Sequence, residues 1–303
     1  MSWVFLTPRH AYKLKKPVRS DSFDFSTIEA RRNDGLEEVR LNRRLAPHVY
    51  LGIVPLVVSG SGEPRLEQTG EAVDWLIKMR RLPADRMLDV LIRQRRLSSH
   101  EVERVGEVLS AFYASAPAID MTGTRYRARL NNRIRSCHEA IREPAYGLAP
   151  RALDAIRDTL ERFIERNATL FDSRVRRVVE GHGDLRPEHI CIERRPVIFD
   201  CLEFNREYRI LDAADELAFL DMECARLGMA DVGSSILRVY AQMTGDRPPE
   251  SLLWFYQASS ACVRAMLAVW HLRDVDQARH RHWLDHAGRY IAFAAARTRR
   301  LEG

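Results

Sequence analysis

The chain has 303 residues, of which 46% are hydrophobic, so it can bury a substantial core without extra domains. Its 48 basic and 42 acidic residues give a net charge of +6, which is too mild to indicate a dedicated nucleic-acid-binding protein. The five cysteines form no C-x-x-C pair and predict reduced thiols in the cytoplasm. The start shows no secretory pattern of a basic flank, an apolar core and a small-residue cleavage site, so we expect no secretion.

Three apolar or alternating runs near the amino terminus predict strands at 3–6, 11–14 and 71–81, and a turn at 7–10 joins the first two. Lys13 and Lys15 lie on one face of the second strand, because strand side chains alternate with period two. Either they serve a site on that face, or they form a solvated strand edge.

A helix is expected over 37–45, where Val39, Leu41 and Leu45 recur at roughly helical spacing. Glu38 lies near the predicted start of this helix. An acid in that position often does no more than favour the helix amino terminus.

After residue 82 the apolar spacing becomes helical. Helices are predicted over 102–112, 153–170, 211–227, 232–243 and 252–272. The last of them is apolar, but polar residues such as Gln257 and Arg264 interrupt it, so it predicts a buried helix rather than a membrane span.

Five arginines crowd the stretch from 125 to 135. Such a cluster would draw an anionic substrate or a nucleic acid to the protein. We favour a solvated helix face, because no set of aromatic residues for base stacking is interleaved with them.

The most informative stretch runs from His182 to Asp200. A short strand at 175–181 leads into a polar loop that holds Asp184. Two apolar runs, 190–192 and 197–199, flank a charged turn and predict a hairpin that returns Asp200 beside that loop.

Phosphoryl transfer needs two such carboxylates. One orients the acceptor hydroxyl and takes its proton, and the other holds the magnesium ion that bridges the nucleotide phosphates. Asp184 suits the first role and Asp200 the second. The alternative is that Asp184 only caps a turn and Asp200 only ends a strand.

The order of HGDL, VIFD and LDAADELAFL resembles the aminoglycoside phosphotransferase branch of the protein-kinase-like fold. More narrowly, SWVFL, AYKLKKP, EEVRLNRRLAP, HGDLRPEHI and FDCLEFN resemble an uncharacterised bacterial family of that branch, often fused to a P-loop domain. The resemblance implies a two-lobed α+β fold. A small antiparallel-sheet N-lobe at 1–82 would bind the nucleotide, and a mostly helical C-lobe at 83–303 would carry the catalytic loop and the metal-binding hairpin.

By this resemblance, Asp184 is the catalytic-loop aspartate, His182 braces the loop and Asp200 is the magnesium ligand. Relatives carry a metal-ligating Asn where this chain has His189. An imidazole suits manganese or zinc better than it suits magnesium. His189 therefore either ligates a metal with a shifted preference or hydrogen-bonds the loop backbone.

The resemblance also implies the nucleotide contacts. Lys13 would contact the phosphates while Glu38 holds it, with Lys15 as the alternative lysine. Met79, near the end of the strand at 71–81, would lie against the adenine, unless it is an ordinary core methionine.

No G-x-G-x-x-G segment precedes Lys13, and no G-x-x-x-x-G-K-[ST] segment occurs in the sequence. Either Met1 is a late start, or backbone amides of the 7–10 turn contact the phosphates. We expect no P-loop fusion partner here.

The leading hypothesis is an ATP-dependent phosphotransferase that acts on a hydroxyl of an unidentified small molecule, with ATP and Mg²⁺ or Mn²⁺ as cofactors. One alternative is a catalytically weakened nucleotide-binding regulator, motivated by His189 and the short amino terminus. A second is a metal-dependent hydrolase, in which His182, Asp184, His189 and Asp200 would ligate a transition metal. The expected partners are a nucleotide and a small acceptor, rather than a membrane or a nucleic acid. Neither the acceptor nor the oligomeric state follows from the sequence.

Overall fold

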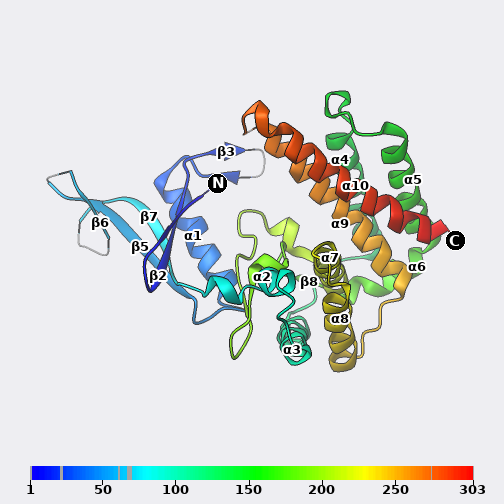
Figure 1. Ribbon diagram of the computed structural model, residues 1–303, viewed down its shortest axis with the longest axis horizontal. Helices are drawn as coiled ribbons and strands as arrows, with labels where there is room; N and C mark the ends of the chain where they lie inside the picture. The colour runs from blue at the N-terminus through cyan, green and yellow to red at the C-terminus, as the bar shows by residue number, and fades with distance from the viewer. Residues whose placement is uncertain (1, 21–22, 61, 67–69, 274, 303) are drawn as a thin grey trace. The chain divides into compact units, whose positions relative to one another are not determined.

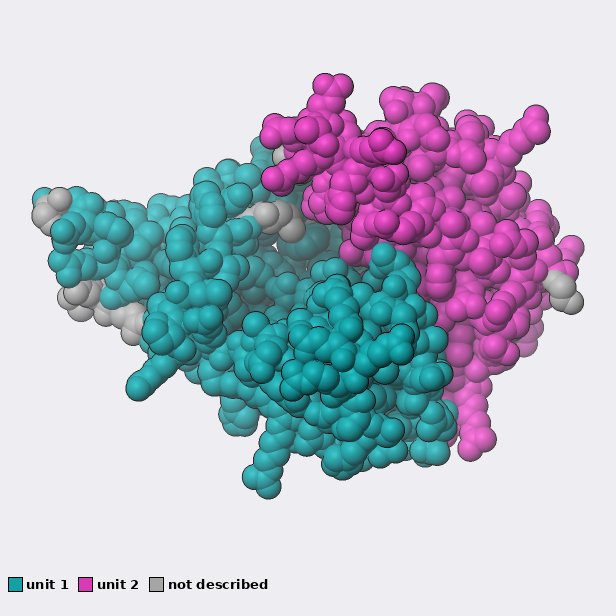
Figure 2. Space-filling view, viewed as in Figure 1, with its two compact units in different colours: residues 1–116, 181–210, 223–244 teal, residues 117–180, 211–222, 245–303 magenta. Residues whose placement is uncertain are grey.

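The computed structural model describes residues 2–20, 23–60, 62–66, 70–273 and 275–302. Two compact units make up the chain (Figure 2). The first contains residues 1–116, 181–210 and 223–244, and the second contains residues 117–180, 211–222 and 245–303. The lobe boundary expected after residue 82 stays a prediction.

The first unit contains a five-stranded antiparallel sheet with the order β1-β2-β7-β5-β6 (Figure 1). Its strands are β1 (Ser2–Leu6), β2 (His10–Lys15), β5 (Tyr50–Val58), β6 (Pro64–Leu66) and β7 (Ala72–Arg80). A separate small ladder pairs β3 (Arg19–Ser20) with β4 (Phe23–Asp24). The three strands predicted from alternation are confirmed, within two residues at each end.

Helix α1 (Ile28–Asn42) packs on strands β5 and β7 of this sheet. The Thr27 hydroxyl accepts a hydrogen bond from the Ala30 N–H at 3.1 Å and so caps its start. The helix can pack close to the sheet because Gly35 faces the strands, where an added Cβ would lie 3.4 Å from the Ile53 side chain. The predicted start at residue 37 is wrong, because polar residues fill the first two turns and hide the apolar period there. Glu38 therefore lies in the second half of the helix.

The first unit also contains three helices and a two-stranded hairpin that follow the sheet in the chain. They are α2 (Leu88–Arg93), α3 (Ser99–Ser115), β9 (Ile190–Cys191), β10 (Val197–Ile198) and α8 (Ala230–Thr244). Strands β9 and β10 pair antiparallel, with Val197 opposite Cys191 and Ile198 opposite Ile190, which confirms the predicted hairpin.

The second unit is mostly helical. It contains α4 (Gly123–Ile141), α5 (Pro150–Arg166), α6 (Ala168–Arg174), α9 (Glu250–Trp270) and α10 (His280–Glu302), together with β8 (Val178–Glu180), which pairs with β11 (Ile210–Asp212). Helix α7 (Ala213–Arg226) begins in this unit. The single helix predicted over 153–170 is two helices, α5 and α6, which meet at Asn167.

The arginine-rich stretch forms helix α4, and several of its guanidinium groups pair with acids of the same unit. Arg133 lies 2.7 Å from Asp215, and Arg135 lies 2.6 Å from Glu161. These pairings reduce the positive charge that the helix presents to an anionic partner.

Helix α9 has the length and apolar composition of a membrane span, but 67% of its most apolar window is buried inside the structure. The buried core helix of a soluble protein can have the same length and apolar composition.

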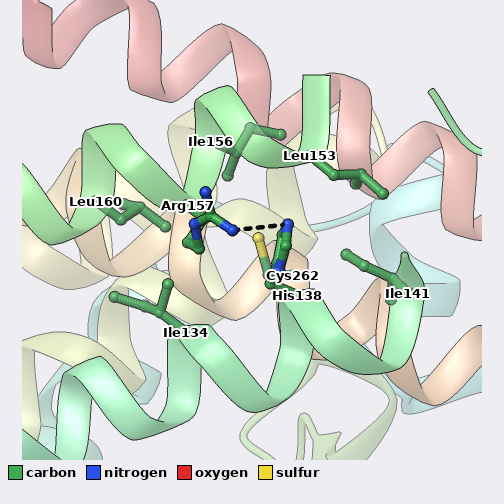
Figure 3. A pocket seen from close by; sticks show the side chains of 8 residues that line it. All are labelled: Ile134, His138, Ile141, Leu153, Ile156, Arg157, Leu160 and Cys262. Atoms are coloured by element: carbon green, nitrogen blue, oxygen red, sulfur yellow. Dashed lines mark hydrogen bonds between the residues drawn. The ribbon is translucent and has the colours of Figure 1, made fainter. Parts of the chain in front are cut away.

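A cavity of about 10 Å³ lies between α4, α5 and α9, lined mainly by aliphatic side chains together with His138 and Cys262 (Figure 3). It has room for about one water molecule and is too small for a sugar or an amino alcohol.

Candidate active site

The first unit brings together a strand lysine, a helix glutamate and the aspartate that follows the hairpin. The Nζ atom of Lys13 lies 2.9 Å from Oε1 of Glu38 and 3.0 Å from Oδ1 of Asp200. Sequence analysis predicted both Lys13–Glu38 and a common site with Asp200, and the three side chains do meet.

Charge pairing dominates this cluster. Burial lowers the pKa of Lys13, but Glu38 and Asp200 outweigh it and raise that pKa well above its usual value. Glu38 is fully buried, and this burial raises its pKa, while Lys13 opposes the shift. The Asp200 side chain is partly exposed; the surrounding protein acts to raise its pKa by desolvation, but Lys13 and His189 outweigh this effect and hold that pKa well below its usual range. Asp200 is therefore a carboxylate at neutral pH and can serve as a hard oxygen ligand.

The backbone at Asp200 has a left-handed conformation, with φ at 61°, which is uncommon for a residue other than glycine. Its N–H donates to the Tyr50 hydroxyl at 3.2 Å, and the next N–H, of Cys201, donates to Oδ1 of Asn42 at 2.9 Å. Asn42 in turn donates to the Glu38 carbonyl at 2.9 Å. Helix α1 thus fixes both the glutamate and the turn that presents Asp200.

His182 hydrogen-bonds across the loop before the hairpin. This side chain is fully buried; the Asp184 N–H donates to its Nδ1 at 3.3 Å, so its Nε2 carries the proton and donates to the Phe199 carbonyl at 2.9 Å. Burial lowers the pKa of His182 to about 4, and His189 adds to the shift. A neutral imidazole therefore connects the loop of Asp184 to the strand end before Asp200.

His189, in the short 3-10 turn Pro187–His189, lies between the two acids. Its Nδ1 donates to the Asp184 carbonyl at 2.8 Å, and its Nε2 lies 3.5 Å from Oδ2 of Asp200. The backbone hydrogen bond that we considered for this residue is present. It leaves Nε2 on the side of Asp200, where Arg186 also donates to it at 3.1 Å, so ligation of a metal by this nitrogen would require Arg186 to turn away and stays a prediction.

The Asp184 side chain is about a quarter exposed and faces an arginine that sequence analysis did not single out. Nε of Arg186 lies 3.1 Å from both Asp184 oxygens, and its Nη2 donates to Nε2 of His189 at 3.1 Å. The sequence could have indicated this contact, because a basic residue stands two positions after the aspartate. Arg186 holds the Asp184 carboxylate in one orientation.

The alternative lysine, Lys15, has different surroundings. Its side chain is only 3% exposed, against 15% for Lys13, and its Nζ lies 2.8 Å from Oε2 of Glu38. It also pairs with Asp34 and Glu203, which sequence analysis did not connect with it. Lys13 thus has the more exposed side chain of the two lysines and is the one in contact with Asp200.

Met79 lies in β7, opposite Ala11 and Tyr50, and is partly buried. It packs on the core of Val39, Ala46, Val49, Tyr50 and Ile77, which also contacts Leu82, Val197 and Phe199. This apolar surface is continuous with the residues that hold Asp200. Met79 is therefore packed against the core, as the alternative interpretation had it, and an adenine contact at its exposed part stays a prediction.

The 7–10 turn offers few amides to a phosphate. The Thr7 N–H donates to the His10 carbonyl at 2.8 Å and the His10 N–H to Oγ1 of Thr7 at 3.0 Å, while Pro8 has no N–H. Only the Arg9 amide is left in this turn. The expectation that the turn replaces a glycine-rich loop therefore has little support from its hydrogen bonds.

Comparison with solved structures identifies the fold. Over 96% of this chain and 75% of the other, it is similar to a glucosamine kinase solved with glucosamine, ADP and inorganic phosphate, with 13% identity and a TM-score of 0.54. A choline kinase from Cryptosporidium parvum matches 97% of this chain and 81% of its own, with 12% identity and a TM-score of 0.52. The chain has the protein-kinase-like fold. The α+β fold class expected from the sequence is confirmed.

Sequence relatives do not add an activity. Uncharacterised proteins of Mycobacterium tuberculosis and Mycobacterium bovis are 32% identical over 272 residues, which cover 86% of this chain and 52% of theirs. The chain spans about half the length of the curated relatives it matches. No protein-family model matches it.

Proposed function

We propose that this protein is an ATP-dependent phosphotransferase that moves the γ-phosphoryl group to a hydroxyl of a small molecule. The observation that carries the proposal is the convergence of Lys13, Glu38 and Asp200, with His189 connecting Asp200 to the Asp184 loop. The fold is that of kinases for choline and glucosamine, and this supports a small acceptor rather than a protein.

In this proposal Asp184 orients the acceptor hydroxyl and takes its proton as the oxygen attacks the γ-phosphorus and the bond to ADP breaks. Arg186 keeps the carboxylate oriented. Lys13 binds phosphate oxygens, and Glu38 prevents its ammonium from turning away.

The donor set fits a divalent cation. Asp200 offers a charged oxygen on a side chain that is 41% exposed, and Nε2 of His189, 3.5 Å away, could join it once Arg186 no longer donates to that nitrogen. When bound, Mg²⁺ or Mn²⁺ would neutralise charge on the nucleotide phosphates. The mixed oxygen and nitrogen set favours Mn²⁺ more than a set of oxygens alone would.

The decisive experiment compares Asp184→Asn with the wild type. We expect turnover to fall about 100- to 10,000-fold, while ATP with Mn²⁺ still raises the melting temperature. Asp85→Asn, an exposed acid of the same unit, is the control. Full activity of Asp184→Asn would overturn the proposed mechanism.

The acceptor can be sought with a panel of hydroxylated metabolites and an ATP-consumption readout. Choline, ethanolamine and glucosamine belong in the panel, because solved structures of this fold are named as kinases for these compounds. Aminoglycosides belong in it because of the sequence resemblance. We place the protein in the cytoplasm, with a nucleotide and a small acceptor as its partners.

A nucleotide-binding regulator is the second candidate. The hydrogen bond from Arg186 to Nε2 of His189 occupies the lone pair that a second metal would need. Nucleotide binding without turnover across the panel would favour this candidate. The hydrolase alternative is disfavoured, because both ring nitrogens of His182 are used in hydrogen bonds, one with the Asp184 N–H and one with the Phe199 carbonyl.

A further inference from the structure

Lys15 lies in a cluster of three carboxylates. Its Nζ pairs with those of Asp34, Glu38 and Glu203, which come from helix α1 and from the segment after Asp200. The Lys15 side chain is 3% exposed, and the three acids are 0% to 12% exposed. An ammonium group with this many buried acidic partners is unusual for a strand-end lysine, which is normally solvated.

The spacing of the three acids is that of cation ligands. One carboxylate oxygen from each lies within 4.8 Å of the others. Three carboxylates at this distance repel one another strongly in a buried site unless a positive charge lies between them. Lys15 supplies that charge.

Glu38 links this cluster to the proposed nucleotide site. Its Oε1 pairs with Lys13 and its Oε2 with Lys15, so each oxygen has its own ammonium partner. Glu203 lies three positions after Asp200, so Lys15 also connects the Asp200 segment to α1. The orientation in which Glu38 holds Lys13 therefore depends on Lys15.

We propose that Lys15 is a positioning residue whose ammonium group takes the place of a divalent cation among Asp34, Glu38 and Glu203. It keeps Glu38 directed at Lys13 and keeps metal ions away from these three acids, so that Asp200 is the carboxylate left to bind one. The role of Asp200 as the carboxylate that binds the metal rests on the proposed phosphotransferase function, whereas the role of Lys15 among the three acids does not.

The test is Lys15→Ala, which removes the ammonium and leaves space for a hydrated ion. Without nucleotide, Lys15→Ala should bind one more Mn²⁺ per chain than the wild type, as measured by the loss of the free Mn²⁺ signal in electron paramagnetic resonance. Adding Glu203→Ala to this variant removes a ligand and should abolish the extra site. Lys16→Ala is the matched control, because the contact of Lys16 is with the Trp3 ring.

If Lys15→Ala is unstable because its acids are uncompensated, Mn²⁺ should raise its melting temperature more than that of the wild type. The proposal is overturned if Lys15→Ala has the same Mn²⁺ stoichiometry and the same Mn²⁺-induced shift in melting temperature as the wild type. Neither readout requires phosphotransferase activity, so this outcome is distinct from failure of the proposed function.

Activity gives a second readout. We expect kcat/KM for ATP to fall about 100-fold in Lys15→Ala, mainly through KM, because Lys13 loses its fixed orientation. Excess Mn²⁺ should restore part of the loss by occupying the vacated position. A merely structural role for Lys15 would give a loss that metal does not restore.

Discussion

The Nζ atom of Lys13 lies 3.0 Å from Oδ1 of Asp200, although 187 positions separate the two residues. A strand of the sheet and the end of a hairpin far along the chain thus contribute to one ion-paired cluster. Glu38 is the second partner of the same ammonium at 2.9 Å. The ammonium is held in place before any phosphate arrives, and this lowers the entropic cost of binding one.

Lys13→Met should weaken ATP binding about 10- to 100-fold, because a charge-assisted hydrogen bond to phosphate contributes about 1.5–3 kcal/mol. The variant should remain folded, since Glu38 keeps Lys15 as a partner. Isothermal titration with a non-hydrolysable ATP analogue and Mn²⁺ measures the affinity. Lys16→Met should bind as the wild type does, and equal affinity in Lys13→Met would contradict the assigned role.

His189→Asn should raise the ratio of Mg²⁺-supported to Mn²⁺-supported turnover. The amide oxygen is a harder ligand than the imidazole nitrogen that now lies 3.5 Å from Asp200. Loss of the Nδ1 hydrogen bond to the Asp184 carbonyl should also lower the free energy of unfolding by about 1 kcal/mol. Initial rates with each metal give the ratio, with the exposed His48→Asn as the control. An unchanged ratio would mean that His189 only braces the loop.

The parts of this structure that local patterns determine could be predicted from the sequence. Alternation of apolar residues gave the strands that carry Lys13 and Met79, and a charged turn between two apolar runs gave the hairpin before Asp200. These signals lie within about ten residues of each feature. The juxtaposition of Lys13 and Asp200 required the resemblance to a known fold.

The other contacts depend on tertiary packing and leave no local signal. Nothing near Tyr50 in the sequence indicates that its hydroxyl accepts the Asp200 N–H, and nothing near Lys15 indicates three acidic partners. The start of α1 was missed for a related reason. Its first turns pair polar side chains with distant residues, as Arg31 does with Asp74 at 2.9 Å, so the apolar period is absent there.

Stability should fall as the pH drops from 6.5 toward 4, because of His182. Its pKa is depressed by burial to about 4 in the folded protein, against 6.5 for an ordinary histidine. Below pH 6.5 the unfolded state takes up a proton that the folded state refuses, and the folded state loses about 3 kcal/mol by pH 4. This contribution is fully present above pH 6.5.

Urea unfolding at a series of pH values measures this loss. His182→Gln should remove about 3 kcal/mol of the pH dependence in that window, whereas the exposed His48→Gln should leave it unchanged. If the wild type and His182→Gln lose stability in parallel between pH 6.5 and pH 4, the buried histidine does not bind its proton as inferred.

Gly183→Ala should destabilise the protein and misplace Asp184. The backbone at Gly183 has φ at 87°, and an added Cβ would lie 3.0 Å from Cγ of Arg209 and 3.1 Å from Cβ of Leu202. Arg209 is itself buried and cannot swing away. We expect a loss of about 2 kcal/mol in the free energy of unfolding from the left-handed backbone and the crowding together.

Gly288→Ala in helix α10 is the matched control, since a Cβ there meets nothing within 4 Å. It should gain about 0.5–1 kcal/mol, because alanine is the better helix former. The measurement is the midpoint of urea unfolding together with turnover of each variant. Because Gly183 precedes the proposed catalytic aspartate, turnover of Gly183→Ala should fall even at temperatures where the variant is fully folded, and a folded variant with unchanged turnover would mean that the loop tolerates a different backbone path.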